Sequence, residues 1–348
     1  MANRHLKQRL VSPIFSTIPF SVFDRVTREL LIIPYYHIVS DSEVLHVKNL
    51  YKNKTIRQFK EDIDFLLRHY SPVSLREVLS SIKADRPLSK RVFLLTFDDG
   101  FREIYDIIAP ILLDKGIPAT FFISTGFLDN RELCYQHKAS LLVEKMREGI
   151  SSRIEGEIRE ILMKSGFSTP RLSEGVLKVD YRRKAVLDRI SQVLLVDFQN
   201  YLNEEQPYLT SDQTKDLIGR GFTIGAHSID HPHFVTLSLP EQLQQTIVSM
   251  KHIRESFGLD YGAFAFPHND DGVSREFFQT IQKSGLIDIT FGTGGITNGG
   301  LKSHQQRISL ETPLLPARRI IAWQYMRRFY KELRGRENIL EVTYGETF

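Results

Sequence analysis

VFLLTFDDG, residues 92–100, is the stretch that decides the fold of this chain. A run of six mostly apolar residues ends abruptly in two carboxylates, as a buried strand does when it delivers polar side chains to the edge of a sheet. Neighbouring carboxylates at the end of an apolar strand repel each other unless a cation or a proton lies between them. The alternative is that the Asp pair caps the next helix, and this segment alone leaves both interpretations open.

A second strand carries histidines at its end. FTIGA at 222–226 is followed by HSIDHPH at 227–233. Two imidazoles four residues apart at a strand-to-loop junction can face one centre, and imidazole with carboxylate is a favoured ligand set for zinc and similar ions. For an isolated pair, a polar loop with local hydrogen bonds is the alternative. In a parallel α/β barrel, however, the carboxyl ends of all strands meet at one face. We therefore expect one cleft that contains Asp98, Asp99, His227 and His231.

Short apolar runs alternate with helical patterns along the chain, which is typical of β-α units around a parallel sheet. Capping boxes, such as Thr55 with Gln58, mark several helix starts. The predicted strands are 31–38, 92–98, 119–124, 222–227, 263–267, 287–292 and a weaker one near 307–310. From about 131 to 207 the pattern is helical and charged. The sequence thus predicts an α/β barrel of about seven strands with a helical insertion between the two motifs.

Length and composition support this interpretation. The chain has 348 residues, 41% hydrophobic and 25% charged, which fits globular proteins and excludes disorder, collagen and coiled coil. A single cysteine, Cys134, excludes an intramolecular disulfide and a multi-thiolate zinc site. The net charge of +4 is uneven, because segment 317–336 contributes seven Arg/Lys against one Glu and segment 1–29 five Arg/Lys against two acids.

The two motifs resemble those of a known family. TFDDG at 96–100 and HSxxH at 227–231 are similar to the first two motifs of the polysaccharide deacetylases, carbohydrate esterase family 4, which share the NodB homology domain. PYYHIVSD at 34–41 also resembles the first strand of that domain. The resemblance covers roughly 30–130 and 208–310. It implies a distorted (β/α)7 barrel, which agrees with the seven predicted strands.

The resemblance also implies an activity. It is that of a metal-dependent hydrolase that removes N-acetyl groups from an N-acetylated sugar or polysaccharide in surface-glycan metabolism. Asp99, His227 and His231 would hold one divalent ion, with zinc as the first expectation and cobalt or nickel as alternatives. The ion would acidify a water molecule, and Asp98 would accept its proton as the general base.

The later motifs depart from the family pattern. AFAFPHNDDG at 263–272 keeps the proline of the third motif but lacks its arginine, and His268 there either contacts substrate or is a solvated loop residue. The fifth motif, whose histidine protonates the leaving amine, has no clean match. His304 is expected at the surface, and His37, at the end of the first strand, is the other candidate to face the cleft. We therefore predict His37 and His268 in the substrate pocket and leave the general acid open.

Two other functions stay open. Related barrels cleave other C–N bonds, such as those of cyclic amides, and a non-catalytic glycan-binding relative could retain the metal. The complete set of four polar residues argues against the second, because a structural metal would not need Asp98. A nucleic-acid partner is not expected, since no aromatic-interleaved basic motif occurs outside the C-terminal helix. The sugar and the oligomeric state are not predicted.

The ends of the chain set the expected domain organisation: a basic segment 1–29, a barrel over 30–336 and a tail over 337–348. The N-terminal segment resembles a secretory signal peptide. However, Pro13 and Pro19 interrupt its apolar part, and no small-residue cleavage site follows. We therefore expect a cytoplasmic chain, with secretion through an atypical signal as the alternative.

The basic segment 317–336 is expected to form the last barrel helix, with its charged face in solvent. The alternative is that this face lies on anionic lipid headgroups, which would make the protein peripheral to a membrane.

Overall fold

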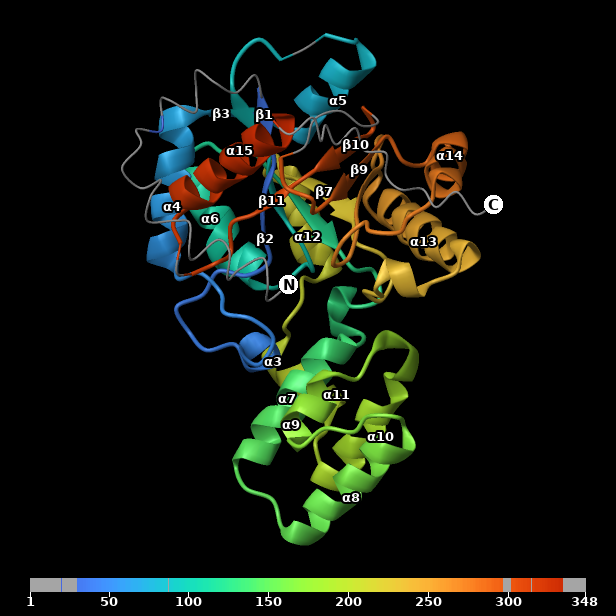
Figure 1. Cartoon of the computed structure of the whole chain (residues 1–348). Helices are drawn as coiled ribbons and strands as arrows, with labels where there is room; N and C mark the ends of the chain where they lie inside the picture. Colours follow the sequence, from blue (N-terminus) through green and yellow to red (C-terminus); the bar gives the residue numbers. More distant parts are fainter. Residues whose placement is uncertain (1–19, 21–29, 87, 297–301, 314, 334–348) are drawn as a thin grey trace.

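The structure is a computed structural model that describes residues 20, 30–86, 88–296, 302–313 and 315–333. The predicted C-terminal tail and, apart from Phe20, the predicted N-terminal segment lie outside these residues. Figure 1 shows two regions, a barrel surrounded by helices and a helical lobe beside it.

The barrel is built from parallel strands in the order β10-β9-β8-β7-β6-β5-β2-β11. Their bounds are β2 (Pro34–Tyr36), β5 (Leu95–Phe97), β6 (Ala119–Ile123), β7 (Thr223–Ala226), β8 (Ala263–Ala265), β9 (Ile289–Gly292), β10 (His304–Gln306) and β11 (Ile308–Ser309). Only Arg307 separates β10, which pairs with β9, from β11, which pairs with β2. Together, β10 and β11 bring the two edges of this eight-stranded sheet next to each other, and the predicted fold class, a distorted (β/α) barrel, is confirmed.

Helices cover the outside of the barrel, and every residue of β5 to β9 is buried, as is typical of a parallel sheet covered on both faces. The covering helices are α4 (Ile56–His69), α5 (Leu75–Lys83), α6 (Ala109–Asp114), α12 (Ser211–Gly219), α13 (Leu239–Phe257), α14 (Arg275–Lys283) and α15 (Ala317–Leu333). A small sheet, β1 (Leu31–Ile32), β4 (Val92–Phe93) and β3 (Ser71–Pro72), extends the amino ends of two strands. Thr55 and Gln58 form the predicted capping box of α4.

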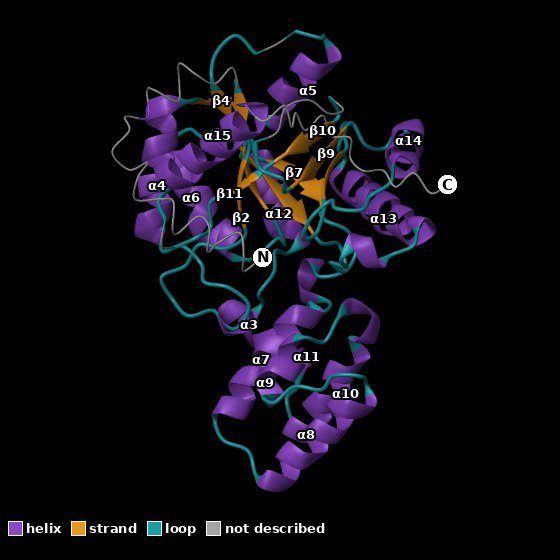
Figure 2. Cartoon of the chain, in the orientation of Figure 1, coloured by secondary structure: helices purple, strands orange, loops and turns teal. Residues whose placement is uncertain are grey.

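The lobe interrupts the barrel between β6 and β7 and is helical throughout (Figure 2). It contains α7 (Tyr135–Arg147), α8 (Ser152–Lys164), α9 (Leu172–Leu177), α10 (Ala185–Leu194) and α11 (Phe198–Glu205), and α3 (Leu45–Lys48) packs against α7. Its core, with Leu142, Ile158 and Leu187, is separate from that of the barrel. Because the lobe leaves the barrel at the carboxyl end of β6, it lies at the same face as the ends of β5 and β7.

The last helix, α15, packs on α4 with its apolar side. Ile320, Ile321 and Tyr325 are buried, and the Tyr325 and Tyr70 hydroxyls hydrogen-bond at 2.9 Å. Arg318 and Arg319 are exposed on the other side. Among the described helices, none is both long enough and apolar enough to cross a bilayer. Contact of this helix with anionic lipid stays a prediction, as does the location of the protein in the cell.

Candidate metal centre and active site

The carboxyl ends of β5 and β7 bring three potential metal ligands together. Asp99 follows β5, and its Oδ1 lies 3.4 Å from His227 Nε2 and 3.2 Å from His231 Nε2. Among the described residues, Asp99 Oδ1 and His227 Nε2 have no hydrogen-bond partner although both are buried. Ligand atoms about 2.1 Å from a tetrahedral ion lie about 3.4 Å apart, so these separations suit a divalent ion. Buried polar atoms without a partner are rare, and a bound cation would satisfy both of these.

The protonation of the two imidazoles fits metal binding. Burial lowers the pKa of His227 and of His231 to about 4, so both rings are neutral at physiological pH. The Nδ1 of His227 lies 2.9 Å from the carbonyl oxygen of Ala265. Because a carbonyl only accepts, Nδ1 carries the proton and Nε2 keeps its lone pair toward Asp99. Burial also raises the pKa of the Asp99 carboxyl, the direction that a cation would reverse.

The backbone around these ligands is strained. Asp99, Ser228, His231 and His268 all have left-handed φ angles between 60° and 70°. Such conformations cost about 1–3 kcal/mol each in residues other than glycine, and they gather at functional sites. Ser228 compensates locally, because its Oγ accepts a hydrogen bond from the His231 backbone N–H at 3.0 Å. The sequence after β7 is thus held in a loop that aims two imidazoles at Asp99.

Asp98 sits beside the ligands in a fully buried ion pair. Both guanidinium nitrogens of Arg307 donate to its carboxylate, at 2.6 and 2.7 Å, and Arg307 is itself completely buried. Burial raises the pKa of Asp98, but the charge of Arg307, followed by that of His227, outweighs this and holds the pKa at about 2. Asp98 is therefore a carboxylate with a fixed orientation.

His37, at the end of β2, is charged for a similar reason. Its Nδ1 hydrogen-bonds to the carboxylate of Glu311, which also accepts the backbone N–H of Ile38. Burial lowers the pKa of His37, but Glu311 outweighs burial and raises it to about 10. Tyr36 pairs with Phe97, so His37 and Asp98 follow neighbouring strands at the same end, and the charges of Asp99 and Asp98 raise the pKa of His37 further. The structure therefore presents a protonated imidazole beside the candidate metal centre.

Two more side chains contact this group. The Tyr51 ring lies 5.7 Å from the His37 ring, and its hydroxyl is buried without a hydrogen-bond partner in the described part of the chain. The centre of the His268 ring lies 4.6 Å from that of His231 and 4.9 Å from that of His233, on which it stacks. His268 therefore packs against a candidate metal-binding residue and is not a solvated loop residue. Tyr51 thus packs on His37, and His268 packs on His231; their contact with substrate stays a prediction.

Sequence reasoning missed two charged groups and misplaced one histidine. Arg307 and Glu311 lie on either side of β11, and positions 307, 309 and 311 alternate with the apolar Ile308 and Leu310. That period of two, with charges at both ends, was the available signal. The expectation of a surface position for His304 is wrong: it is 5% exposed, and its ring bonds Thr290 at 2.8 Å and Asp270 at 3.0 Å. The strand that closes the barrel begins earlier than predicted.

Comparisons with known proteins agree with the fold. The family model for polysaccharide deacetylase matches residues 85–164, which include Asp98 and Asp99. The structure of a Streptococcus pyogenes deacetylase, PplD in complex with acetate, is similar over 84% of this chain and 97% of its own, at 17% identity and a TM-score of 0.53. IcaB from Ammonifex degensii is similar over 84% of this chain and 96% of its own, at 17% identity and a TM-score of 0.54. No curated protein matches the chain.

These two structures show that the chain has the barrel fold of the deacetylases named above. The predicted resemblance to the polysaccharide deacetylases is confirmed over residues 85–164.

Proposed function

We propose that this protein is a metal-dependent hydrolase that removes N-acetyl groups from an N-acetylated sugar of a glycan. One observation carries the proposal: a three-ligand cluster has a fixed carboxylate, Asp98, and a protonated imidazole, His37, beside it. Amide hydrolysis needs both a group that accepts a proton from water and a group that gives one to the leaving nitrogen.

Asp98 is suited to the role of general base. A divalent ion held by Asp99, His227 and His231 would supply Lewis acidity that activates water and polarises the acetyl carbonyl. The Asp98 carboxylate stays ionised at every working pH, and Arg307 fixes the direction in which its oxygens point. It can therefore accept the proton of the attacking water without reorganising.

His37 is suited to the role of general acid. As water adds to the acetyl carbon and the C–N bond breaks, the nitrogen must gain a proton to leave as an amine. His37 is protonated below pH of about 10, and its side chain is 23% exposed, so its free edge is accessible to substrate. Glu311 holds Nδ1, which leaves Nε2–H for the nitrogen. The products are acetate and an amino sugar.

Zinc is the ion we propose, with cobalt and nickel as alternatives. Two imidazole nitrogens and one carboxylate oxygen are ligands that these three ions share, whereas magnesium and calcium favour oxygen alone.

Acetate release from N-acetylated oligosaccharides tests the function. Asp98→Asn should abolish release while bound metal, measured by elemental analysis, is retained, and His227→Ala should lose the metal. His252→Ala, on α13, contributes no ligand to the cluster and serves as the control. Unchanged acetate release in Asp98→Asn, or full metal content in His227→Ala, would contradict these roles.

The same assay separates the alternatives. Ring opening of a cyclic amide without acetate release from any glycan would indicate a different C–N hydrolase. Glycan binding by the metal-loaded protein without any turnover would indicate a non-catalytic relative.

A further inference from the structure

The second ring nitrogen of His231 has no hydrogen-bond partner among the described residues. Its Nε2 lies 3.2 Å from Asp99 Oδ1, whereas its Nδ1 is buried and unpartnered. In His227, the corresponding Nδ1 lies 2.9 Å from the Ala265 carbonyl oxygen. A histidine that binds a metal through one nitrogen carries a proton on the other, and it normally donates that N–H to an acceptor that fixes the orientation of the ring. The Nδ1–H of His231 therefore needs an acceptor.

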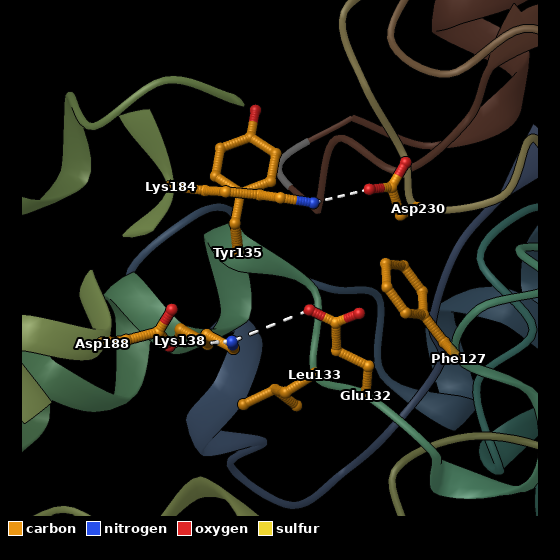
Figure 3. Close-up of a pocket in the computed structure, with 8 residues that line it drawn as sticks. All are labelled: Phe127, Glu132, Leu133, Tyr135, Lys138, Lys184, Asp188 and Asp230. Carbon is orange, nitrogen blue, oxygen red and sulfur yellow. Dashed lines mark hydrogen bonds and ion pairs between the residues drawn. The ribbon is translucent and has the colours of Figure 1, made fainter. Parts of the chain in front are cut away.

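Hydrogen bonds fix the main chain that leads into His231. Ser228 Oγ accepts the His231 backbone N–H at 3.0 Å. The carboxylate of the preceding residue, Asp230, accepts from Lys184 Nζ of the helical lobe at 2.6 Å (Figure 3) and from Gln245 Nε2 on α13 at 2.8 Å. Because the main chain is fixed, the direction of the His231 Nε2 depends on the rotation of the imidazole, which the neighbouring side chains must set.

His268 is the neighbour that can accept the proton of His231. The centre of its ring lies 4.6 Å from that of the His231 ring, with 58° between the ring planes. The Nε2 of His268 is also buried and has no hydrogen-bond partner in the described part of the chain. Two imidazoles joined in line by an N–H···N bond have ring centres about 5 Å apart, because the bond itself measures about 3 Å. A neutral imidazole has one nitrogen that accepts, so a small rotation lets the two unpartnered nitrogens satisfy each other.

The loop that carries His268 is itself held in place. Thr293 Oγ1 donates to the His268 carbonyl oxygen at 3.0 Å. Two residues further on, the Asp270 carboxylate accepts from Gln306 Nε2 at 2.6 Å and lies 3.0 Å from His304 Nε2. These bonds maintain the left-handed φ of 60° at His268, which is costly for a residue other than glycine. The loop is thus supported from β9 and β10, and the ring of His268 is kept against His231.

We propose that His268 is a positioning residue: its Nε2 accepts the Nδ1–H of His231 and so keeps the Nε2 of His231 directed at the metal ion. His268 is not one of the three ligands, and it acts on the ion only through His231. This inference rests on the metal-dependent function proposed above. It gives segment 263–272, which lacks the arginine of the third family motif, a role toward the metal. Loss of such a partner typically weakens metal affinity by about 10- to 100-fold.

Two substitutions separate hydrogen bonding from ring packing. His268→Phe keeps an aromatic ring against His231 but has no acceptor, whereas His268→Gln loses the ring and keeps an oxygen about as far from the backbone as Nε2. Zinc dissociation constants are measured by competition with a chelator. We expect zinc binding to be at least about tenfold weaker in His268→Phe and within about threefold of wild type in His268→Gln.

The control and the contrary outcomes use the same measurement. His252→Phe, on α13, removes an imidazole that contributes no ligand to the cluster, and it should leave zinc affinity unchanged. Tight binding in His268→Phe together with weak binding in His268→Gln would show that the ring only packs, and would overturn the proposal. Wild-type affinity in both variants would overturn it as well.

Proton NMR gives a readout that packing alone would not change. In the zinc-loaded wild-type protein, the buried ring N–H protons of His227 and His231 should exchange slowly with water, because each is hydrogen-bonded. His268→Phe should lose the slow signal of His231 and keep that of His227, and His268→Gln should keep both. A slow His231 signal in His268→Phe would mean that another group accepts this proton.

Acetate release distinguishes a failure of this inference from a failure of the proposed function. If the wild-type protein binds zinc but releases no acetate from any glycan, while His268→Phe binds zinc less tightly, the function is wrong and the positioning role stands. If the wild-type protein releases acetate and His268→Phe keeps full zinc affinity, the function stands and the positioning role is wrong. A wild-type protein that binds no divalent ion would overturn both.

Discussion

Two buried ion pairs tie the first half of the barrel to its last segment, and they differ in what surrounds them. Lys54 and Asp62 are both almost completely buried, and Lys54 Nζ lies 2.7 Å from Asp62 Oδ2. Every side-chain polar atom of this pair has a hydrogen-bond partner. Lys54 also donates to the Leu315 carbonyl, and Asp62 accepts from the Tyr36 hydroxyl and the Ala317 backbone N–H. This network connects α4 to the start of α15, and it leaves no unpaired polar atom for a ligand.

The Arg307–Asp98 pair is equally buried and its atoms are equally close together, but some polar atoms around it have no hydrogen-bond partner. Asp99 Oδ1, His227 Nε2 and the Tyr51 hydroxyl all lack a hydrogen-bond partner within the described residues. Burial of unpaired polar groups is costly, and a fold tolerates it where a ligand completes the bonding. In this molecule, the completeness of hydrogen bonding thus distinguishes the Lys54–Asp62 pair from the Arg307–Asp98 pair beside the candidate metal centre.

The largest effect should follow from breaking the structural pair. Lys54→Met leaves Asp62 buried without its cation, and we expect a loss of about 3–5 kcal/mol in the free energy of unfolding, measured by urea denaturation. The kcat for acetate release should stay close to wild type wherever the protein is folded. Lys215→Met, at an exposed pair with Asp212, is the matched control and should change stability little. Wild-type stability in Lys54→Met would contradict the structural role.

Changing the Arg307–Asp98 pair should lower the rate of catalysis. Arg307→Lys keeps the charge but loses the two-pronged hydrogen bond to Asp98, so that the carboxylate is no longer held in one orientation. We expect kcat to fall by about 10- to 100-fold, a share of what a general base contributes. Metal content, measured by elemental analysis, should be unchanged. A kcat within twofold of wild type would show that Arg307 is needed only for folding.

Glu311→Gln should move one limb of the pH–rate profile. In the wild-type protein, Glu311 outweighs burial and raises the pKa of His37 to about 10, so the general acid stays protonated through neutral pH. Without the carboxylate, only the charges of Asp99 and Asp98 oppose burial, which lowers the pKa of this histidine. The alkaline limb of kcat should therefore shift by more than one pH unit toward lower pH. A limb at the wild-type position would mean that another group protonates the amine.

Whether the sequence could predict a residue of this site depended on how far along the chain its contacts lie. Asp98, Asp99, His227 and His231 stand directly after strong apolar strands, and parallel packing alone brings such ends together. Arg307 and Glu311 reach Asp98 and His37 only because β11 pairs with β2, more than 270 positions away along the chain. No local pattern specifies that pairing.

The misplaced His304 has a local cause. Glycines and polar residues precede it, in the segment GGITNGGLKS at 294–303, and such composition is typical of a loop. Its environment comes from Phe266 and Phe278, whose rings lie 5.9 and 4.8 Å away and belong to other elements. Tertiary packing therefore overrides the local signal.

The smallest effect should come from the Tyr51 hydroxyl, and it tests the comparison most directly. An unpaired buried hydroxyl contributes nothing to the folded state, so Tyr51→Phe should keep or slightly raise the melting temperature. If this hydroxyl donates to the bound ligand, the same change should weaken inhibition by acetate several-fold. Tyr105→Phe, which removes a hydroxyl bonded to Asp216 at 2.8 Å, should show the opposite, lower stability with unchanged acetate inhibition. A Tyr51→Phe variant that is less stable and binds acetate normally would place this hydroxyl with the saturated network of Lys54 and Asp62.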